Sequence, residues 1–111
     1  MQIAVEQAGP VTVVELKGRI DSNTATPFGD KLIELLKSGH SRLVVDLKHI
    51  AYISSAGFRA LLLAGKLADE TNGKLALCCL TSEVQRLFDL GAFTDLFVIY
   101  PSRDEGVSKL G

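Results

Sequence analysis

Two adjacent serines, Ser54 and Ser55, form the part of the chain whose residue types most directly offer chemistry. They follow an apolar run and precede Gly57 and an amphipathic stretch, a pattern typical of a strand-to-helix junction. One serine at such a junction can cap a free amide of the first helical turn, but only one of the two can be the N-cap. We expect the other hydroxyl to point outward at the positive end of the helix dipole, where an added phosphate would be stabilised.

The same hydroxyl could instead be a nucleophile, with Asp46 and His49 as its helpers. A Ser-x-Gly sequence on a strand-to-helix turn is similar to the nucleophile elbow, Gly-x-Ser-x-Gly. Here Ile53 stands in place of the leading glycine, and His49 comes shortly before the serine rather than far downstream. The sequence therefore disfavours a small serine hydrolase, and we predict no catalytic residues.

Asp46, Cys78 and Cys79 are the other groups that could do chemistry. Asp46 interrupts an apolar strand, either as a functional acid or as a carboxylate that accepts amides from the following loop. Neighbouring side chains on a strand face opposite sides of a sheet, so we expect the two thiols not to converge on one metal ion. Buried small hydrophobes are their expected role. We predict no metal site, and the chain has no glycine-rich phosphate loop that would indicate a cofactor.

The elements that must position these groups alternate along the chain as β-β-α-β-α-β-α-β-α. Two strand-like runs across Gly9-Pro10 predict a hairpin, and the βα units that follow predict parallel strands. We therefore predict an α/β fold with a mixed, mostly parallel sheet, an N-terminal antiparallel hairpin, and helices packed against the sheet. Other expectations are a linker over 48–53, a capping box of Ser82 and Gln85, and a marginal last helix that frays over 106–111.

Length and composition limit the possible functions. The chain has 111 residues and a formal net charge of -1, which suits one domain over residues 1–111 and disfavours a direct nucleic-acid binder. No apolar run approaches the roughly 18 residues needed to span a bilayer, and the N-terminus does not resemble a signal region. Two cysteines form no disulfide framework. We expect a cytoplasmic protein without membrane insertion.

Two segments carry a resemblance to a known family. Leu43–Leu47 (Leu-Val-Val-Asp-Leu), followed by Ile53–Phe58 (Ile-Ser-Ser-Ala-Gly-Phe), resembles the signature of the STAS-domain anti-sigma-factor antagonists. Gly18–Asp21 resembles the family's second conserved turn, and the order of elements matches over essentially the whole chain. The family motif usually reads Asp-Ser-x-Gly, and Ser54 stands in place of the aspartate. Alignment on the glycine implies Ser55 as the phosphorylated residue, with Ser54 as the second choice.

The resemblance implies a bacterial partner switch in transcription regulation. Unmodified at Ser55, the protein would bind an anti-sigma factor that is also a serine kinase; phosphorylation would release the complex, and a serine phosphatase would restore it. The same fold also occurs in accessory subunits of transporters or of other signalling complexes, and such a non-switching role remains the alternative.

The expected partner-binding surface combines the capping-rich turn, the serine junction and the exposed side of the second helix. Gly57 costs its helix roughly 0.5–1 kcal/mol relative to alanine, which indicates close approach of either the neighbouring strand or a partner. If a partner approaches there, Gly57→Arg leaves the domain folded and weakens binding. Phe58 is expected in the core. The expected partner-binding residues are Asp21, Ser22, Asn23, Thr24, Ser54, Ser55, Gly57 and Arg59.

Overall fold

The sheet has five strands in the order in which they occur in the chain. The computed structural model describes residues 1–111, and its strand order is β1-β2-β3-β4-β5. β1 pairs with β2 antiparallel, whereas the β2–β3, β3–β4 and β4–β5 pairs are parallel. The predicted mixed sheet with an N-terminal hairpin is therefore confirmed. The strands are β1 (Gln2–Ala8), β2 (Val11–Ile20), β3 (Arg42–Ile53), β4 (Lys74–Cys78) and β5 (Val98–Tyr100).

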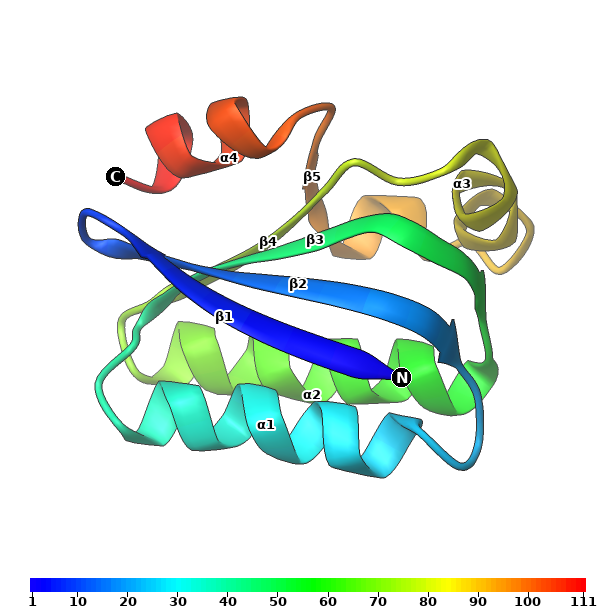
Figure 1. Cartoon of the computed structure of the whole chain (residues 1–111), viewed down its shortest axis with the longest axis horizontal. Helices are drawn as coiled ribbons and strands as arrows, with labels where there is room; N and C mark the ends of the chain where they lie inside the picture. Colours follow the sequence, from blue (N-terminus) through cyan, green and yellow to red (C-terminus); the bar gives the residue numbers. More distant parts are fainter.

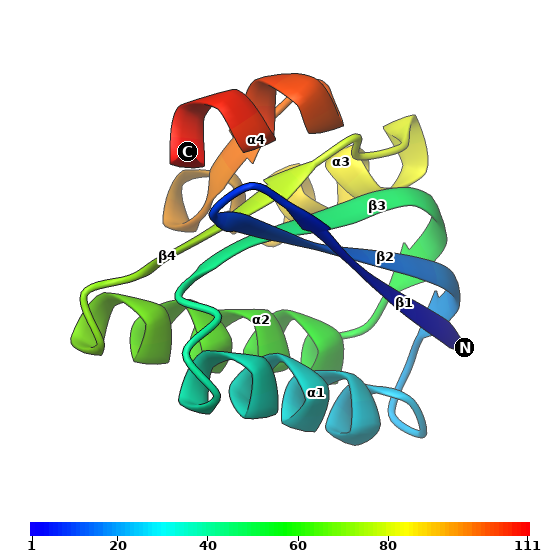
Figure 2. The same ribbon diagram turned by 60° about the vertical axis from the view of Figure 1, so that its left-hand side comes forward.

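The helices cover the two faces of the sheet unequally. α1 and α2 lie side by side against one face, and α4 lies on the opposite face near β4 and β5 (Figures 1 and 2). The larger part of the core fills the space between the sheet and α1, α2 and α3, while a smaller cluster lies beneath α4. The helices are α1 (Ala25–Lys37), α2 (Ser55–Glu70), α3 (Ser82–Leu90) and α4 (Arg103–Leu110), with a 3-10 turn, η1 (Thr94–Leu96).

Alternation along β2 explains how one strand serves both clusters. Val14 and Leu16 belong to the larger core, whereas Val11 and Val13 belong to the cluster beneath α4. Successive strand residues point to opposite faces, so a strand covered on both sides reads as an unbroken apolar run. Asp46 of β3 follows the same rule and faces the α4 side, on the same strand face as Val44.

Two predicted boundaries are wrong. The expected linker over 48–53 is the second half of β3, which pairs with β2 as far as Ile20 and Ile53 across irregular steps in register. The predicted last helix is present as α4, but it is regular as far as Leu110 rather than frayed from residue 106. Leu110 is buried, and Arg42 donates a hydrogen bond to its carbonyl oxygen at 3.0 Å. Both segments are held by contacts with residues distant in the chain.

The start of α3 also differs by one residue from the predicted capping box. Thr81, not Ser82, is the N-cap, and its hydroxyl oxygen accepts from the amide of Val84 at 3.2 Å. The same hydroxyl donates to the carbonyl of Ile50 in β3 at 3.1 Å. Because Thr81 satisfies a helix amide and a strand carbonyl together, this position fixes α3 to the end of the sheet.

Candidate functional site

The two serines at the start of α2 have different roles in the structure. Ser54 is the N-cap, with extended backbone angles, and its side-chain oxygen accepts from the amide of Gly57 at 3.2 Å. Its own amide donates to the carbonyl of Ile20 at 2.8 Å, which ties the junction to the end of β2. Ser55 is the first residue of the helix and is exposed. As the sequence predicted, one hydroxyl caps the helix and the other is left at its positive end.

Gly57 lies against the sheet. A β-carbon at this position would come within 2.6 Å of Cγ2 of Ile20 and 2.7 Å of Cγ1 of Ile53. These distances are shorter than real carbon contacts, so the glycine allows α2 to approach the ends of β2 and β3. The contacts thus favour the neighbouring strands as the explanation of Gly57. A larger side chain here would have to displace Ile20 and Ile53, so we now expect Gly57→Arg to disturb the fold rather than leave it intact.

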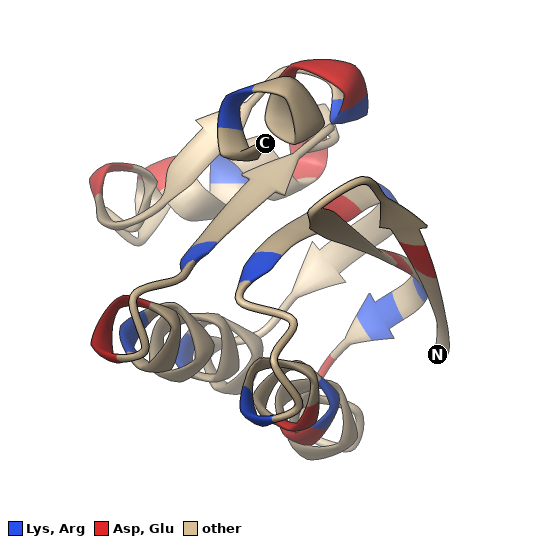
Figure 3. Cartoon of the chain, turned by 90° about the vertical axis from the view of Figure 1, so that its left-hand side faces the viewer, with Lys and Arg blue, Asp and Glu red and all other residues tan.

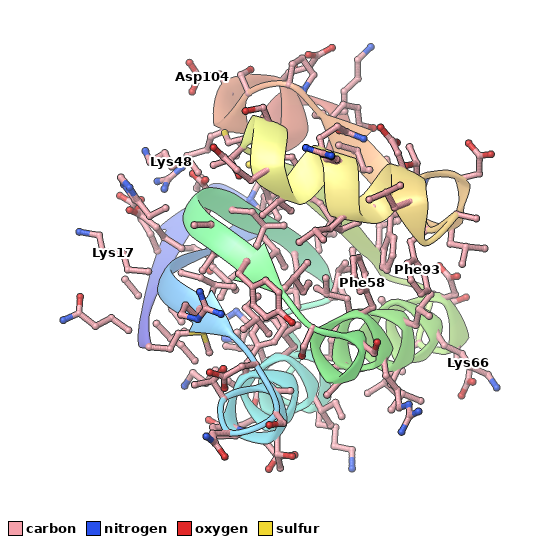
Figure 4. The ribbon with its side chains drawn as sticks, turned by 90° about the vertical axis from the view of Figure 1, so that its right-hand side faces the viewer. Lys17, Lys48, Phe58, Lys66, Phe93 and Asp104 are labelled. Carbon is pink, nitrogen blue, oxygen red and sulfur yellow. The ribbon has the colours of Figure 1, made fainter.

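Phe58 confirms its predicted place in the core. The side chain is 5% exposed. It stacks on Phe93 with ring centroids 4.2 Å apart and meets the edge of Phe88 at 4.8 Å. Figure 4 shows Phe58 and Phe93 side by side near the start of α2. This aromatic cluster holds the first turn of α2, and with it the serine pair, against the segment that follows α3.

The capping-rich turn between β2 and α1 is fixed by its own hydrogen bonds. A carboxylate oxygen of Asp21 accepts from the amides of Asn23 at 2.9 Å and Thr24 at 3.1 Å. These bonds, the one from Asn23 foremost, hold the pKa of Asp21 below its usual value. The Thr24 hydroxyl donates to the carbonyl of Arg19 at 2.7 Å. Ser22 and Asn23 remain exposed, so the turn presents a preformed polar surface.

A groove between α1 and α2 connects this turn with the second helix. Arg59 lies one turn after Ser55, is exposed, and makes no ion pair within the chain. Leu63 is 55% exposed, one further turn along the same groove. The groove therefore carries a cation and an unburied apolar side chain near the exposed serine. Its lining residues are Ser22, Ala25, Thr26, Gly29, Asp30, Ile33, Ala56, Arg59, Ala60 and Leu63.

Asp46 belongs to a charged cluster that the sequence analysis did not identify. Its carboxylate is fully buried and accepts from Nε of Arg103 at 2.9 Å and from the amide of Lys48 at 3.0 Å. Asp46 is thus an amide acceptor, as one interpretation predicted, but the amide belongs to β3 itself and not to a following loop. The same guanidinium reaches Glu15 at 2.6 Å and Glu6 at 2.9 Å. Its hydrogen bond holds the pKa of Glu15 below the usual 4.5. Burial opposes the charge of Arg103, but the bonds to Glu15 and Asp46 outweigh it and raise the pKa of the guanidinium.

The groups considered for a serine hydrolase have partners other than the serine. His49 lies 3.5 Å from Glu15 through Nε2. The other histidine of the chain, His40, lies 3.0 Å from the hydroxyl of Thr12 through Nδ1. Asp46 is bound by Arg103. Neither histidine has Ser55 as its hydrogen-bond partner, so the structure gives no support to nucleophilic activation at this serine.

Two expectations for the cysteine pair are wrong: the side chains do converge, and Cys79 is only partly buried. The thiols of Cys78 and Cys79 and a carboxylate oxygen of Asp46 all lie within 4.8 Å of one another. Cys79 has a φ of 61°, in the left-handed region, which ends the alternation of β4 and turns its side chain toward that of Cys78. Sequence alone gave no sign of this backbone conformation.

None of the helices combines the length and the apolar character that crossing a membrane requires. Positive and negative charges are mixed over the molecule. Figure 3 shows basic and acidic residues interspersed over helices and strands. This distribution agrees with the near-neutral net charge of the sequence.

The fold and the serine junction together place this chain in a known class. A family model described as the STAS domain matches residues 2–106, and the chain belongs to that family. The element order, the mixed sheet and the Ser-Ser-Ala-Gly junction at the start of α2 agree with the resemblance seen in the sequence.

Individual relatives within the family cover nearly the whole chain. BtrV of Bordetella bronchiseptica, described as a candidate anti-sigma factor antagonist, is 31% identical over 104 residues, which are 94% of this chain and 90% of that protein. The anti-sigma F factor antagonist of Paenibacillus polymyxa is 29% identical over 111 residues, with 99% of this chain and 92% of the relative covered.

Solved structures share the fold at lower sequence identity. A crystal structure of a candidate anti-sigma factor antagonist from Thermotoga maritima superposes with a TM-score of 0.90 at 16% identity, covering 97% of this chain and 93% of that one. SpoIIAA of Bacillus in its phosphorylated form superposes with a TM-score of 0.74 at 12% identity, covering 99% and 100%. These likenesses concern the fold.

Proposed function

We propose that this protein is an anti-sigma-factor antagonist that works in a phosphorylation-controlled partner switch. The observation that carries the proposal is the different position of the two serines. Ser54 caps the N-terminus of α2, whereas Ser55 is exposed at the first position of the helix. The relatives named as anti-sigma factor antagonists support it, since they align with this chain over nearly all of its length. The partner is an anti-sigma factor with serine-kinase activity, and a serine phosphatase reverses the modification.

The effect of phosphate on binding follows from the position of Ser55. A phosphoserine carries roughly 1.5–2 negative charges at neutral pH. At a helix N-terminus this charge is locally favourable, so the domain stays folded. A partner surface complementary to a neutral hydroxyl must desolvate the phosphate or oppose it, and binding weakens. The protein thus acts by binding and release, without a catalytic step of its own.

The surface that contacts the partner extends from the junction in two directions. In one direction it includes the turn between β2 and α1, which is held by its own hydrogen bonds and exposes Ser22 and Asn23. In the other direction it includes the α1–α2 groove with Arg59 and Leu63. Gly57 is buried, so we remove it from the proposed contact residues and assign it to the packing of α2.

Affinity capture with serine variants tests this function. The unmodified protein and its Ser55→Ala, Ser55→Asp and Ser82→Asp variants are immobilised and exposed to lysate of the encoding bacterium. Ser82 is the matched control, because it is also an exposed serine at the first position of a helix. A kinase-type ATP-binding protein should be retained by all but Ser55→Asp.

Incubation of the captured kinase with ATP and the unmodified domain then identifies the phosphorylated residue by tandem mass spectrometry. Phosphate on Ser55 is the expected result, and phosphate on Ser54 alone would overturn the alignment of the motif. Recovery of transporter subunits without a kinase would favour the accessory-subunit alternative.

A further inference from the structure

The thiols of Cys78 and Cys79 lie together at the end of β4. Cys78 is the last residue of the strand, and Cys79 continues the chain with a φ of 61°. Both sulfur atoms and an oxygen of Asp46 lie within 4.8 Å of one another. The backbone of Cys79 is held in place by its amide, which donates to the carbonyl of Tyr100 in β5 at 3.2 Å.

The neighbouring carboxylate is already neutralised by the protein. One oxygen of Asp46 accepts from the amide of Lys48 at 3.0 Å, and the other accepts from Arg103 at 2.9 Å. A metal ion bound by the thiols and this carboxylate would therefore have to displace the guanidinium or share its oxygen. The two sulfur atoms are better placed to react with each other than to hold a cation.

The two thiols differ in access to solvent. Cys78 is completely buried in the cluster beneath α4, and burial raises the pKa of its thiol well above the usual value. Cys79 is only partly buried. A thiol has to be reached by its oxidant and reacts as the thiolate, so Cys79 is the residue that an oxidant in solution meets first.

We propose that Cys78 and Cys79 form a reversible disulfide between adjacent residues when the protein meets a hydroperoxide such as hydrogen peroxide. The Cys79 thiolate attacks one oxygen of the peroxide; the O–O bond breaks, and the released hydroxide takes up a proton as water. Cys79 is left as a sulfenic acid. The Cys78 sulfur then attacks the sulfenic sulfur, the S–S bond forms, and the S–O bond breaks. The hydroxyl leaves with the Cys78 proton as a second water, so two thiols lose two electrons and one peroxide gains them.

The bond formed in this way is easily reduced. Adjacent α-carbons are about 3.8 Å apart across a trans peptide, shorter than the usual 4.4–6.8 Å of a disulfide. The resulting strain favours reduction by monothiols, which is typical of regulatory rather than structural disulfides. Closing so small a loop also removes little entropy from the unfolded chain, so the oxidised form gains little stability.

Intact-mass measurement on the full chain tests the proposal. The reduced protein is treated with one equivalent of hydrogen peroxide, the excess is destroyed with catalase, and free thiols are alkylated with iodoacetamide in denaturant. The expected product is a monomer lighter by two hydrogen atoms that takes up no alkyl group, and glutathione restores both alkylations. In Cys78→Ser, Cys79 should accumulate as a sulfenic acid that dimedone traps; in Cys79→Ser, the remaining thiol should stay largely unreacted.

The serine variants keep the size of the side chain, and far-UV circular dichroism verifies that they are folded. Two alkylatable thiols after peroxide treatment, or a disulfide-linked dimer in place of the lighter monomer, would overturn the proposal. Equal oxidation of Cys78 in the Cys79→Ser variant would contradict the assigned order of attack.

Discussion

Replacing Gly57 by alanine tests whether α2 is positioned by direct contact with the sheet. The added methyl group would lie 2.6 Å from Ile20 and 2.7 Å from Ile53, and both contacts are with carbons near the branch of a stiff side chain. Overpacking of this kind costs about 1–3 kcal/mol. The intrinsic preference of a helix for alanine over glycine returns about 0.5–1 kcal/mol. The difference of the two ranges is a net loss of up to about 2.5 kcal/mol of unfolding free energy, with a central value of about 1 kcal/mol.

A second glycine of the same helix is the matched control. Gly65 has no heavy atom within 4 Å of its hypothetical β-carbon. Gly65→Ala should therefore gain up to about 1 kcal/mol from helix propensity alone. The two substitutions are chemically identical, so a difference in sign isolates the contact with β2 and β3 from the effect of alanine on the helix.

Urea unfolding followed by far-UV circular dichroism measures both variants. The midpoint should fall for Gly57→Ala and rise for Gly65→Ala, with unchanged slopes. In thermal melts each kcal/mol corresponds to a shift of roughly 4–8 °C for a domain near this size. A Gly57→Ala variant stabilised as much as Gly65→Ala would refute the packing of α2 described here.

Three further predictions follow from individual side chains. Arg103→Ala leaves the buried carboxylate of Asp46 without its main partner, and the unfolding free energy measured in urea should fall toward the lower end of the roughly 3–5 kcal/mol typical of broken buried pairs, because the arginine is partly exposed. The pKa of Glu15 is depressed in the folded state, so its contribution to stability is complete above pH 4.5 and is lost as the pH falls; Glu15→Gln should make the acid side of a pH–stability curve less steep, and an unchanged curve would contradict this. Thr81→Ala should cost about 1 kcal/mol by loss of the α3 cap, whereas Ser82→Ala should be nearly neutral in the same assay, and the reverse order would favour the capping box.

The sequence predicted the features that depend on local pattern. The hairpin, the parallel units and the N-cap at the serine junction follow from alternation, helical spacing and capping residues, all within short windows of the chain. The role of Phe58 followed from its spacing on the helix. In each of these elements the spacing of apolar residues determines which face of the strand or helix is buried.

The features that the sequence did not predict depend on residues distant in the chain. The register that pairs Glu15 with Asp46 places two acids side by side, and only the folded chain brings Arg103 to them. Two acids at paired positions of neighbouring strands need a positively charged partner. Once the register is known, that need indicates that a basic side chain such as Arg103 lies nearby. The left-handed backbone of Cys79 occurs together with the hydrogen bond from its amide to Tyr100 of β5, and no local pattern indicates it.

The most direct test of the proposed switch is the dissociation constant of the captured kinase for this domain, unmodified and phosphorylated at Ser55. Isothermal titration should give binding at least tenfold weaker for the phosphorylated domain, a difference of about 1.4 kcal/mol or more. Circular dichroism spectra of the two forms should be the same, because the phosphate lies at an exposed helix N-terminus. Equal dissociation constants for the two folded forms would contradict the account.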